Sequence, residues 1–277
     1  MKALERFRAR KGFKLREEDA GATPLRDDDG GKLGKAEVKQ RERDLTTELA
    51  IGAAALQEKL YAARRHKLLL VLQGMDTSGK DGTVRKLFSH INPMGLKATG
   101  FTLPTTRERA HDFLWRVHPH VPGNGEIAIF NRSHYEDVLV PRVAGDIDGK
   151  EVKRRYAQIR DFERMLAESG TTIMKVFLHI SKDEQRKRLQ SRLIDPEKHW
   201  KFDPADVAAR AQWDDYQRAY EDAIGATDAD HAPWYVVPAD SKTHRNLVIS
   251  HLLLETMQRM KLEWPAPKAD LSQVRIE

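Results

Sequence analysis

The sequence predicts an α/β protein of three layers, in which helices cover both faces of a parallel sheet. Five short apolar runs alternate with longer amphipathic segments along the chain. This alternation is typical of parallel strands joined by crossover helices. Runs such as residues 175–180, in which four of the six residues are apolar, favour strands buried on both faces. Ligands of such sheets bind beyond the carboxyl ends of the strands, so functional residues are expected there.

The elements follow in order along the chain. Residues 1–34 are rich in charge and predict an extended or partly disordered arm, and spaced leucines over residues 35–65 predict a helix. Together these segments form an N-terminal extension, residues 1–65. The main domain is expected over residues 66–265, followed by a C-terminal tail, residues 266–277. The predicted strands are residues 68–73, 99–103, 126–131, 172–180 and 234–238.

Composition narrows the class of protein. The chain has 277 residues and no cysteine, which excludes disulfides and thiolate chemistry. Its 48 basic and 42 acidic residues give a net charge of +6, and this excess suits a polyanion: nucleic acid, a nucleotide or an inorganic phosphate chain. There is no apolar run long enough to span a membrane and no apolar segment of a secretory signal, so we expect a cytoplasmic protein without membrane contact.

The most informative segment follows the first predicted strand. It reads Gly-Met-Asp-Thr-Ser-Gly-Lys-Asp-Gly over residues 74–82, and a helical pattern begins at Lys80. Glycines at this spacing let backbone N–H groups turn toward phosphate oxygens, and the lysine and the helix N-terminus add positive charge. The alternative is a strand–turn–helix with glycines placed by chance. The expected phosphate-binding residues are Gly74, Met75, Thr77, Ser78, Gly79, Lys80, Asp81 and Gly82.

Two carboxylates distinguish this loop. Asp81 stands where a serine or threonine usually holds magnesium, and Asp76 lies inside the loop. A carboxylate in that place repels phosphate unless a metal ion or an arginine intervenes. Asp76 is therefore either a group directed at magnesium or a structural turn residue.

A second motif follows the strand 126–131. Phosphate-loop proteins normally have a magnesium-binding carboxylate after this strand, but the position is Asn131, and Glu136 and Asp137 come later. Arg132 could bind a phosphoryl group with both arms of its guanidinium. The alternative is a salt bridge within the loop between Arg132 and Asp137.

Residues 182–202 are unusually rich in cations and predict a mobile lid. Arg188 and Arg192 are four residues apart and so share a helix face, and the helical pattern breaks at Asp195-Pro196. The alternative is a solvated charged helix. After the last strand, His244, Arg245 and Asn246 could line a nucleotide base or simply cap the terminal helix.

Five ordered motifs together resemble the polyphosphate kinase 2 family. They are residues 74–82, 130–137, 195–202, 213–216 and 238–246, and the resemblance covers about residues 35–265. It implies a P-loop kinase fold like that of thymidylate kinase, with a helical lid. It also implies phosphoryl transfer between inorganic polyphosphate and nucleotides that depends on Mg²⁺, or on Mn²⁺ in its place. The implied catalytic residues are Asp76, Lys80, Arg132, Arg188 and Arg192.

The resemblance also implies roles for other residues. Glu136 and Lys198 would contact the phosphates or the nucleotide, and Asp76 and Asp137 would hold magnesium, directly or through water. Asn131 departs from the aspartate of many members. Residues 133–137 look like the subgroup that accepts both AMP and ADP, and guanine nucleotides are further candidates. Nucleic acid is not an expected partner, and a homo-oligomer, dimer or tetramer, is expected.

Two rival functions remain open from the sequence. One is an ATP-dependent nucleotide kinase of the same fold, which differs in its phosphoryl donor. The other is a non-catalytic protein that binds polyanions, against which the presence of Asp76, Lys80 and Arg132 argues. A GTPase is disfavoured because the chain contains no Asn-Lys-x-Asp motif.

Overall fold

A computed structural model, which describes residues 2–26 and 33–276, contains a five-stranded sheet in the order β2-β3-β1-β4-β5. All neighbouring strands are parallel. The predicted parallel α/β architecture is therefore confirmed, although β2 begins three residues before the expected segment. The strands are β1 Lys67–Gln73, β2 Leu96–Gly100, β3 Ile127–Asn131, β4 Thr171–His179 and β5 Trp234–Pro238.

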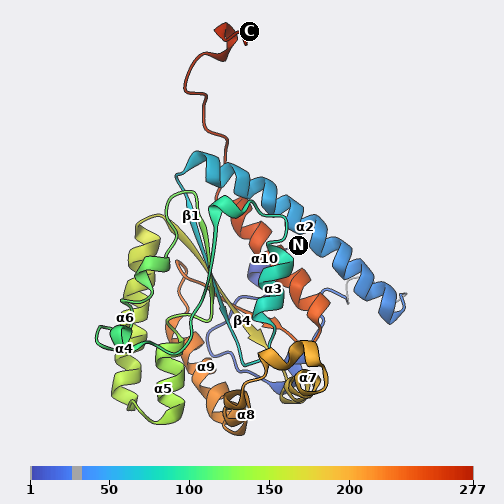
Figure 1. The fold of residues 1–277 in the computed structure, drawn as a ribbon, viewed down its shortest axis with the longest axis vertical. Helices are drawn as coiled ribbons and strands as arrows, with labels where there is room; N and C mark the ends of the chain where they lie inside the picture. The colour runs from blue at the N-terminus through green and yellow to red at the C-terminus, as the bar shows by residue number, and fades with distance from the viewer. Residues whose placement is uncertain (1, 27–32, 277) are drawn as a thin grey trace.

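Helices cover both faces of the sheet (Figure 1). One layer contains α2 (Lys35–Ala63), α3 (Lys80–Leu87) and α10 (Lys242–Arg259), with α10 packed along α2. The other layer contains α5 (Glu136–Ala144), α6 (Gly149–Glu168) and α9 (Trp213–Thr227). The shorter elements are α1 Ala3–Arg6, α4 Thr106–Arg109, α7 Lys182–Ile194, α8 Pro204–Ala211, and the 3₁₀ turns η1 Glu17–Gly21, η3 Pro93–Gly95, η4 His118–His120, η5 Pro196–Lys201 and η6 Leu271–Gln273.

The long helix α6 shows how apolar residues at helical spacing in the sequence form a buried face. Asp148 begins it by accepting a hydrogen bond from the backbone N–H of Glu151 at 2.8 Å. Val152, Ile159 and Leu166 recur on one face and are buried against the sheet and α9. The helix expected from this spacing is therefore present.

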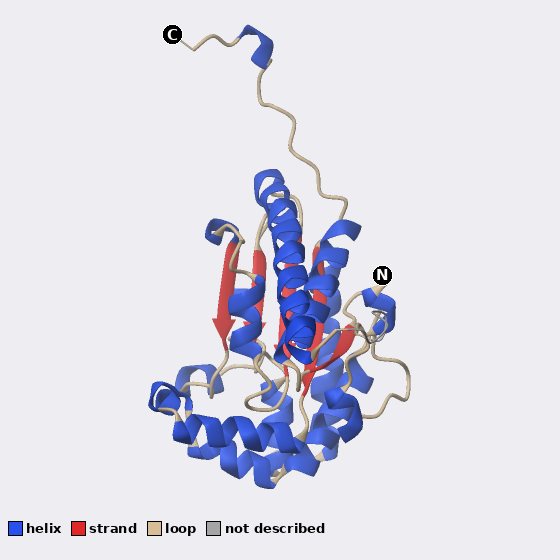
Figure 2. Cartoon of the chain, turned by 90° about the vertical axis from the view of Figure 1, so that its right-hand side faces the viewer, coloured by secondary structure: helices blue, strands red, loops and turns tan. Residues whose placement is uncertain are grey.

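Because neighbouring strands are all parallel, they end at the same edge of the sheet, and the visible arrows point toward an end of the molecule where a layer of helices lies (Figure 2). The loops that leave this end include residues 74–79, residues 132–135 and the start of α7. The candidate site residues from three distant motifs therefore meet at the carboxyl edge of the sheet, as the parallel topology requires.

The N-terminal arm lies on the body of the protein. Val236 donates its N–H to Phe7 O at 2.9 Å and Ala9 donates to Trp234 O at 2.8 Å, so residues 7–9 extend the sheet beside β5. Arg8 forms an ion pair with Asp228 at 2.9 Å. The prediction of partial disorder is therefore wrong for residues 2–26, because apolar contacts and backbone pairing offset their high charge; residues 27–32 lie outside the described residues.

The chain leaves the body after Leu262, which is buried, and residues 266–276 extend away from it (Figure 1). Across the described ranges, we find no helix with the length and apolar character that crossing a bilayer requires.

Candidate active site

The loop between β1 and α3 has the backbone that its sequence demands. Gly74 and Gly79 have φ values of +150° and +102°. A Cβ atom on Gly74 would lie 2.7 Å from Leu178 O, so no other residue fits there without movement. Lys80 folds back over the loop, and its Nζ donates to Gly74 O at 2.7 Å. Burial lowers the pKa of Lys80, and the neighbouring Arg132 lowers it further. A phosphate bound in the loop would therefore meet a desolvated ammonium.

Arg132 faces this loop from the end of β3. Its Nη2 donates to Asp76 Oδ1 at 2.5 Å, and its backbone has a φ of +61°. The alternative of a salt bridge between Arg132 and Asp137 is therefore wrong. The positive charge of Arg132 therefore offsets the repulsion that the Asp76 carboxylate would otherwise exert on a phosphate bound in the loop.

Two further polar contacts fix the edge of the loop. Asn131 donates its side-chain amide to Asp81 Oδ1 at 2.6 Å. The carboxylate of Glu136, at the start of α5, lies 2.9 Å from the side-chain amide group of Gln73. Burial raises the pKa of Glu136, while Arg132 and Lys80 oppose that rise. The structure thus gathers Asp76, Lys80, Arg132 and Glu136 into one charged group.

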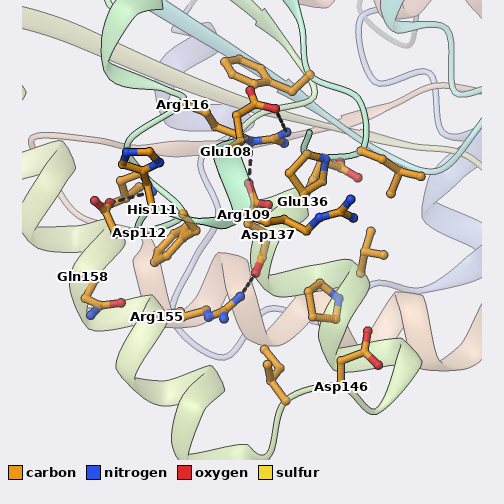
Figure 3. Close-up of a pocket in the computed structure, with 18 of the residues that line it drawn as sticks. Glu108, Arg109, His111, Asp112, Arg116, Glu136, Asp137, Asp146, Arg155 and Gln158 are labelled. Carbon is orange, nitrogen blue, oxygen red and sulfur yellow. Dashed lines mark hydrogen bonds and ion pairs between the residues drawn. The ribbon is translucent and has the colours of Figure 1, made fainter. Parts of the chain in front are cut away.

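A cleft of about 1040 Å³ opens beside this group (Figure 3). Arg132 and Glu136 line it together with Phe101, Phe113 and Arg109. Its volume admits a small organic molecule such as a nucleotide, and its walls combine apolar side chains with both arginines and carboxylates. The cleft therefore places a binding space directly beside the phosphate loop.

Asp137 lies in the wall of the cleft and is engaged by arginine (Figure 3). Arg116 donates to its Oδ2 at 3.2 Å, and Arg155 binds its backbone oxygen. Burial raises the pKa of Asp137, and Arg116 opposes that rise. The expected second magnesium carboxylate is thus held by Arg116 in the wall of the cleft.

Arg188 reaches the loop from α7 but contacts its backbone. Its Nη1 donates to Thr77 O at 2.9 Å and to Ser78 O at 3.2 Å, and its Nη2 donates to Ala239 O and Asp240 O, both at 2.8 Å. Its Nε donates to Glu184 at 2.8 Å. All five guanidinium N–H donors are engaged. Arg188 therefore holds the loop, and no donor is left for a substrate in this arrangement.

Two further cations of the predicted lid, Arg192 and Lys198, have carboxylate partners. Arg192 pairs with Asp206 of α8 at 2.7 Å, and Lys198 pairs with Asp195 at 2.6 Å. Burial raises the pKa of Asp206 to about 6, and the nearby Asp76 carboxylate raises it in the same direction. Sequence reasoning missed Asp206 because only the fold of the lid brings residue 206 to residue 76.

The residues at the start of α10 do not line the cleft. His244 is fully buried, and its Nδ1 lies 2.8 Å from Glu42 Oε1 of α2. Arg245 is also buried, and its Nη1 donates to Ser78 O at 2.9 Å. Ser241 caps the helix with its side chain. Of the two alternatives, the structure favours a supporting role for this segment over contact with a base in this cleft.

Comparisons with known proteins identify chains and a family model that are similar to this sequence. The family model described as Polyphosphate kinase 2 matches residues 32–265. The AMP/ADP-polyphosphate phosphotransferase of Meiothermus ruber is 54% identical over 222 residues, which cover 80% of this chain and 83% of the relative. The ADP-polyphosphate phosphotransferase of Rhodopseudomonas palustris is 44% identical, with 79% and 82% covered.

More distant relatives and solved structures extend the likeness. The GDP-polyphosphate phosphotransferase of Mycolicibacterium smegmatis is 33% identical, with 76% of this chain and 73% of the relative covered. The crystal structure of polyphosphate kinase 2 from Arthrobacter aurescens TC1 superposes with a TM-score of 0.91 at 44% identity, covering 98% of this chain and 94% of that chain.

Proposed function

Because this chain belongs to the polyphosphate kinase 2 family, we propose that it transfers phosphoryl groups between inorganic polyphosphate and nucleotides, with AMP and ADP as acceptors. The observation that carries the proposal is that Arg132, which lines the large cleft, is hydrogen-bonded to Asp76 of the phosphate loop, over which Lys80 folds back. The name of the Meiothermus ruber relative supports both acceptors. The name of the Mycolicibacterium smegmatis relative supports guanine nucleotides as further acceptors.

The phosphate loop and the cleft would each bind one of the two substrates. Polyphosphate would lie on the backbone N–H groups of residues 74–82, and the acceptor nucleotide would occupy the cleft with its phosphates toward Arg132. An oxygen of the terminal nucleotide phosphate then attacks the end phosphorus of the chain. The new P–O bond forms as the bond to the next phosphate breaks, and the shortened chain leaves with the electron pair; the reverse reaction follows the same path.

Lys80 and Arg132 stabilise the charge on the transferring group. Before the reaction Lys80 is held by Gly74 O, and Asp76 holds Arg132 beside the loop until a phosphoryl group takes the place of this carboxylate. Phosphoryl transfer needs mainly positioning and charge stabilisation of this kind. The proposal therefore requires no covalent intermediate on the enzyme.

We propose Mg²⁺ as the metal. The donor set fits this ion, since Asp76 and Asp206 supply carboxylate oxygens beside the loop and Mg²⁺ is commonly held by one or two carboxylates with substrate phosphates. Within residues 2–26 and 33–276, no cluster of three or more His, Asp or Glu could hold a metal alone, which agrees with a site completed by substrate. When bound, the ion would supply neutralisation of charge on the phosphate oxygens.

The test mixes the protein with Mg²⁺, polyphosphate and ADP, with no ATP added, and follows the formation of ATP. Parallel samples contain AMP in place of ADP, EDTA in place of Mg²⁺, Lys80→Ala, and Lys86→Ala as a matched control on the same helix. We expect the wild-type protein to form ATP from ADP, and ADP and ATP from AMP. Both activities should be lost with EDTA and in Lys80→Ala, and both should be kept in Lys86→Ala. Absence of product with folded wild-type protein would favour an ATP-dependent kinase or a binding protein.

Assembly and location remain parts of the proposal. We propose a homo-oligomer that acts in the cytoplasm, where nucleotides are supplied. The apolar side chains of Leu45 and Ile51 are exposed on α2, which suits a contact between copies. Light scattering of the full chain, with Ile51→Glu as the variant, measures the assembly; a monomeric wild-type protein would contradict it.

A further inference from the structure

Arg245 contacts residues 78 and 79 of the phosphate loop from behind, on the side opposite the face on which a phosphate would lie. It belongs to the first turn of α10 and is 2% exposed. Its Nη1 donates to Ser78 O at 2.9 Å. A Cβ atom on Gly79 would lie 1.9 Å from that Nη1. A side chain at residue 79 would therefore have to displace the Arg245 guanidinium, in addition to adopting a backbone angle that favours glycine.

The charge of Arg245 has no counter-ion in the described part of the chain. Its remaining hydrogen bonds go to the neutral Asn246 side chain, at 2.9 and 3.2 Å. No described carboxylate forms an ion pair with it, and the cations of Arg188 and Lys242 lie close enough to oppose its charge. Burial lowers the pKa of Arg245 to about 9, and Arg188 lowers it further in the same direction. A buried cation beside a second cation is costly unless an anion compensates it.

Both arginines act on the same peptide group. Arg188 and Arg245 donate to Ser78 O at 3.2 and 2.9 Å. Because the peptide is planar and trans, fixing this carbonyl on the rear side directs the Gly79 N–H to the front of the loop. That N–H is one of the groups on which a phosphate would lie. The pair therefore orients the peptide dipole and adds two positive charges behind it.

We propose that Arg245 is a positioning residue for polyphosphate: with Arg188 it fixes the 78–79 peptide, and the phosphates bound on the loop compensate its buried charge. This inference rests on the proposed binding of polyphosphate to the loop. It differs from a purely structural role in one respect. Removing the charge should spare the ligand-free protein and weaken the liganded one.

The test compares Arg245→Met with the wild type and with Arg160→Met. Arg160 also donates to a backbone carbonyl, Ala226 O at 2.9 Å, but on α6 at the opposite face of the sheet. Calorimetry measures binding of magnesium tripolyphosphate and, separately, of AMP; thermal unfolding is followed with and without tripolyphosphate. For Arg245→Met we expect tripolyphosphate affinity to fall about 10–100-fold, comparable to losing one charged hydrogen-bonding group. AMP affinity should stay within about twofold, and the ligand-free melting temperature should be equal or higher.

The outcomes separate the inference from the proposed function. Wild-type protein that does not bind tripolyphosphate contradicts the proposed function itself. Wild-type binding that Arg245→Met retains in full overturns only the role of Arg245. Equal weakening of AMP and tripolyphosphate, with a lower ligand-free melting temperature, also overturns it, because general loss of structure would explain both. Should Arg245→Met not fold, Arg245→Lys decides: a fall in tripolyphosphate affinity of about threefold or more with AMP unchanged supports the role, and wild-type affinity refutes it.

Discussion

Two cation–carboxylate pairs flank the same segment, residues 132–135, and they differ in their access to solvent. Arg132 and Asp76 meet at 2.5 Å at the cleft, with side chains 39% and 21% exposed. Lys175 and Glu163 meet at the same distance in the core, with side chains 0% and 1% exposed. The distance is equal, but water and substrate can reach only the first pair.

The core pair is fully satisfied by its neighbours. Lys175 Nζ also contacts Tyr135 OH at 3.0 Å and Thr227 O at 2.9 Å, which accounts for its three donors. Tyr135 OH in turn contacts Glu163 at 2.9 Å. The network therefore anchors Tyr135, three residues after Arg132, and fixes the loop from below.

The cleft pair has the opposite character. Asp76 neutralises the charge of Arg132 in the absence of substrate. A phosphoryl group could replace it, because its oxygens can accept two parallel hydrogen bonds from the same guanidinium. An exposed pair can exchange partners at small cost, whereas a buried one cannot. Ion pairs of similar geometry can therefore have different roles. The pair at the cleft can exchange its carboxylate for a phosphoryl group, whereas the pair in the core holds residues 132–135 in place.

The largest effect is expected when the cleft pair is removed by substitution of Arg132. Arg132→Gln should lower kcat by about 10³–10⁵, or about 4–7 kcal/mol, because a cation on the transferring phosphoryl group is lost. Stability should change little, since the pair is partly exposed. Steady-state kinetics and thermal unfolding measure the two effects. A variant with nearly normal kcat would exclude Arg132 from charge stabilisation.

The core pair should respond in stability. Lys175→Met leaves Glu163 buried without its cation, and we expect a loss of about 3–5 kcal/mol in the free energy of unfolding. The double variant Lys175→Met/Glu163→Leu should recover much of this loss, because no lone charge remains. Urea unfolding of the single and double variants gives both values. A cost below about 1 kcal/mol for the single variant would show that the pair is not needed to fix the segment.

The features that sequence reasoning predicted are local ones. The strand, the glycines and Lys80 lie within 16 consecutive residues of 67–82, and Arg132 directly follows an apolar strand. The parallel topology then brings these two segments to one edge of the sheet, so that their meeting is predictable without coordinates.

The features that it missed depend on contacts across the whole chain. Arg245 reaches Ser78 over 167 residues, and Glu42 reaches His244 over 202. The motif around Arg245 was visible, but no pattern indicates which face of the loop an arginine occupies. Arg188 was expected to face substrate for the same reason: helix spacing places its Cα, while its hydrogen bonds to Thr77 O and Asp240 O depend on the folded loop.

A further buried carboxylate, Glu42, allows the role of a buried ion pair to be tested by pH. Glu42 is 3% exposed and accepts hydrogen bonds from Arg26 at 2.8 Å and Thr243, with His244 beside it. Burial alone would raise the pKa of Glu42, but its hydrogen bonds with His244 and Arg26 prevail and lower it to about 2. Since this pKa is lower in the folded than in the unfolded chain, its stabilisation is full above about pH 4.5 and disappears as the pH falls toward 2.

The corresponding variant is Glu42→Gln. We expect it to lose about 2–3 kcal/mol of stability at pH 7 and to show a smaller loss than the wild type between pH 4.5 and pH 2. Urea unfolding over this range measures the difference, with the exposed Glu37→Gln on the same helix as the control. Parallel pH curves for wild type and Glu42→Gln would contradict the assignment.

The smallest effect, a change in melting temperature, is expected from a substitution of Asn131 at the exposed edge of the loop. Asn131→Asp replaces the donor that contacts Asp81 at 2.6 Å and places two carboxylates together. Because this edge is open to water, the repulsion should cost only about 1 kcal/mol, or about 2 °C in melting temperature, without Mg²⁺. A divalent cation between the carboxylates would offset the repulsion, so Mg²⁺ should raise the melting temperature of the variant more than that of the wild type. Thermal unfolding with and without Mg²⁺ measures this, and Asn131→Ala, which adds no charge, is the control. If Mg²⁺ stabilises all three proteins equally, the carboxylates at this edge do not bind the ion, and the exposed side of the site tolerates added charge through solvation alone.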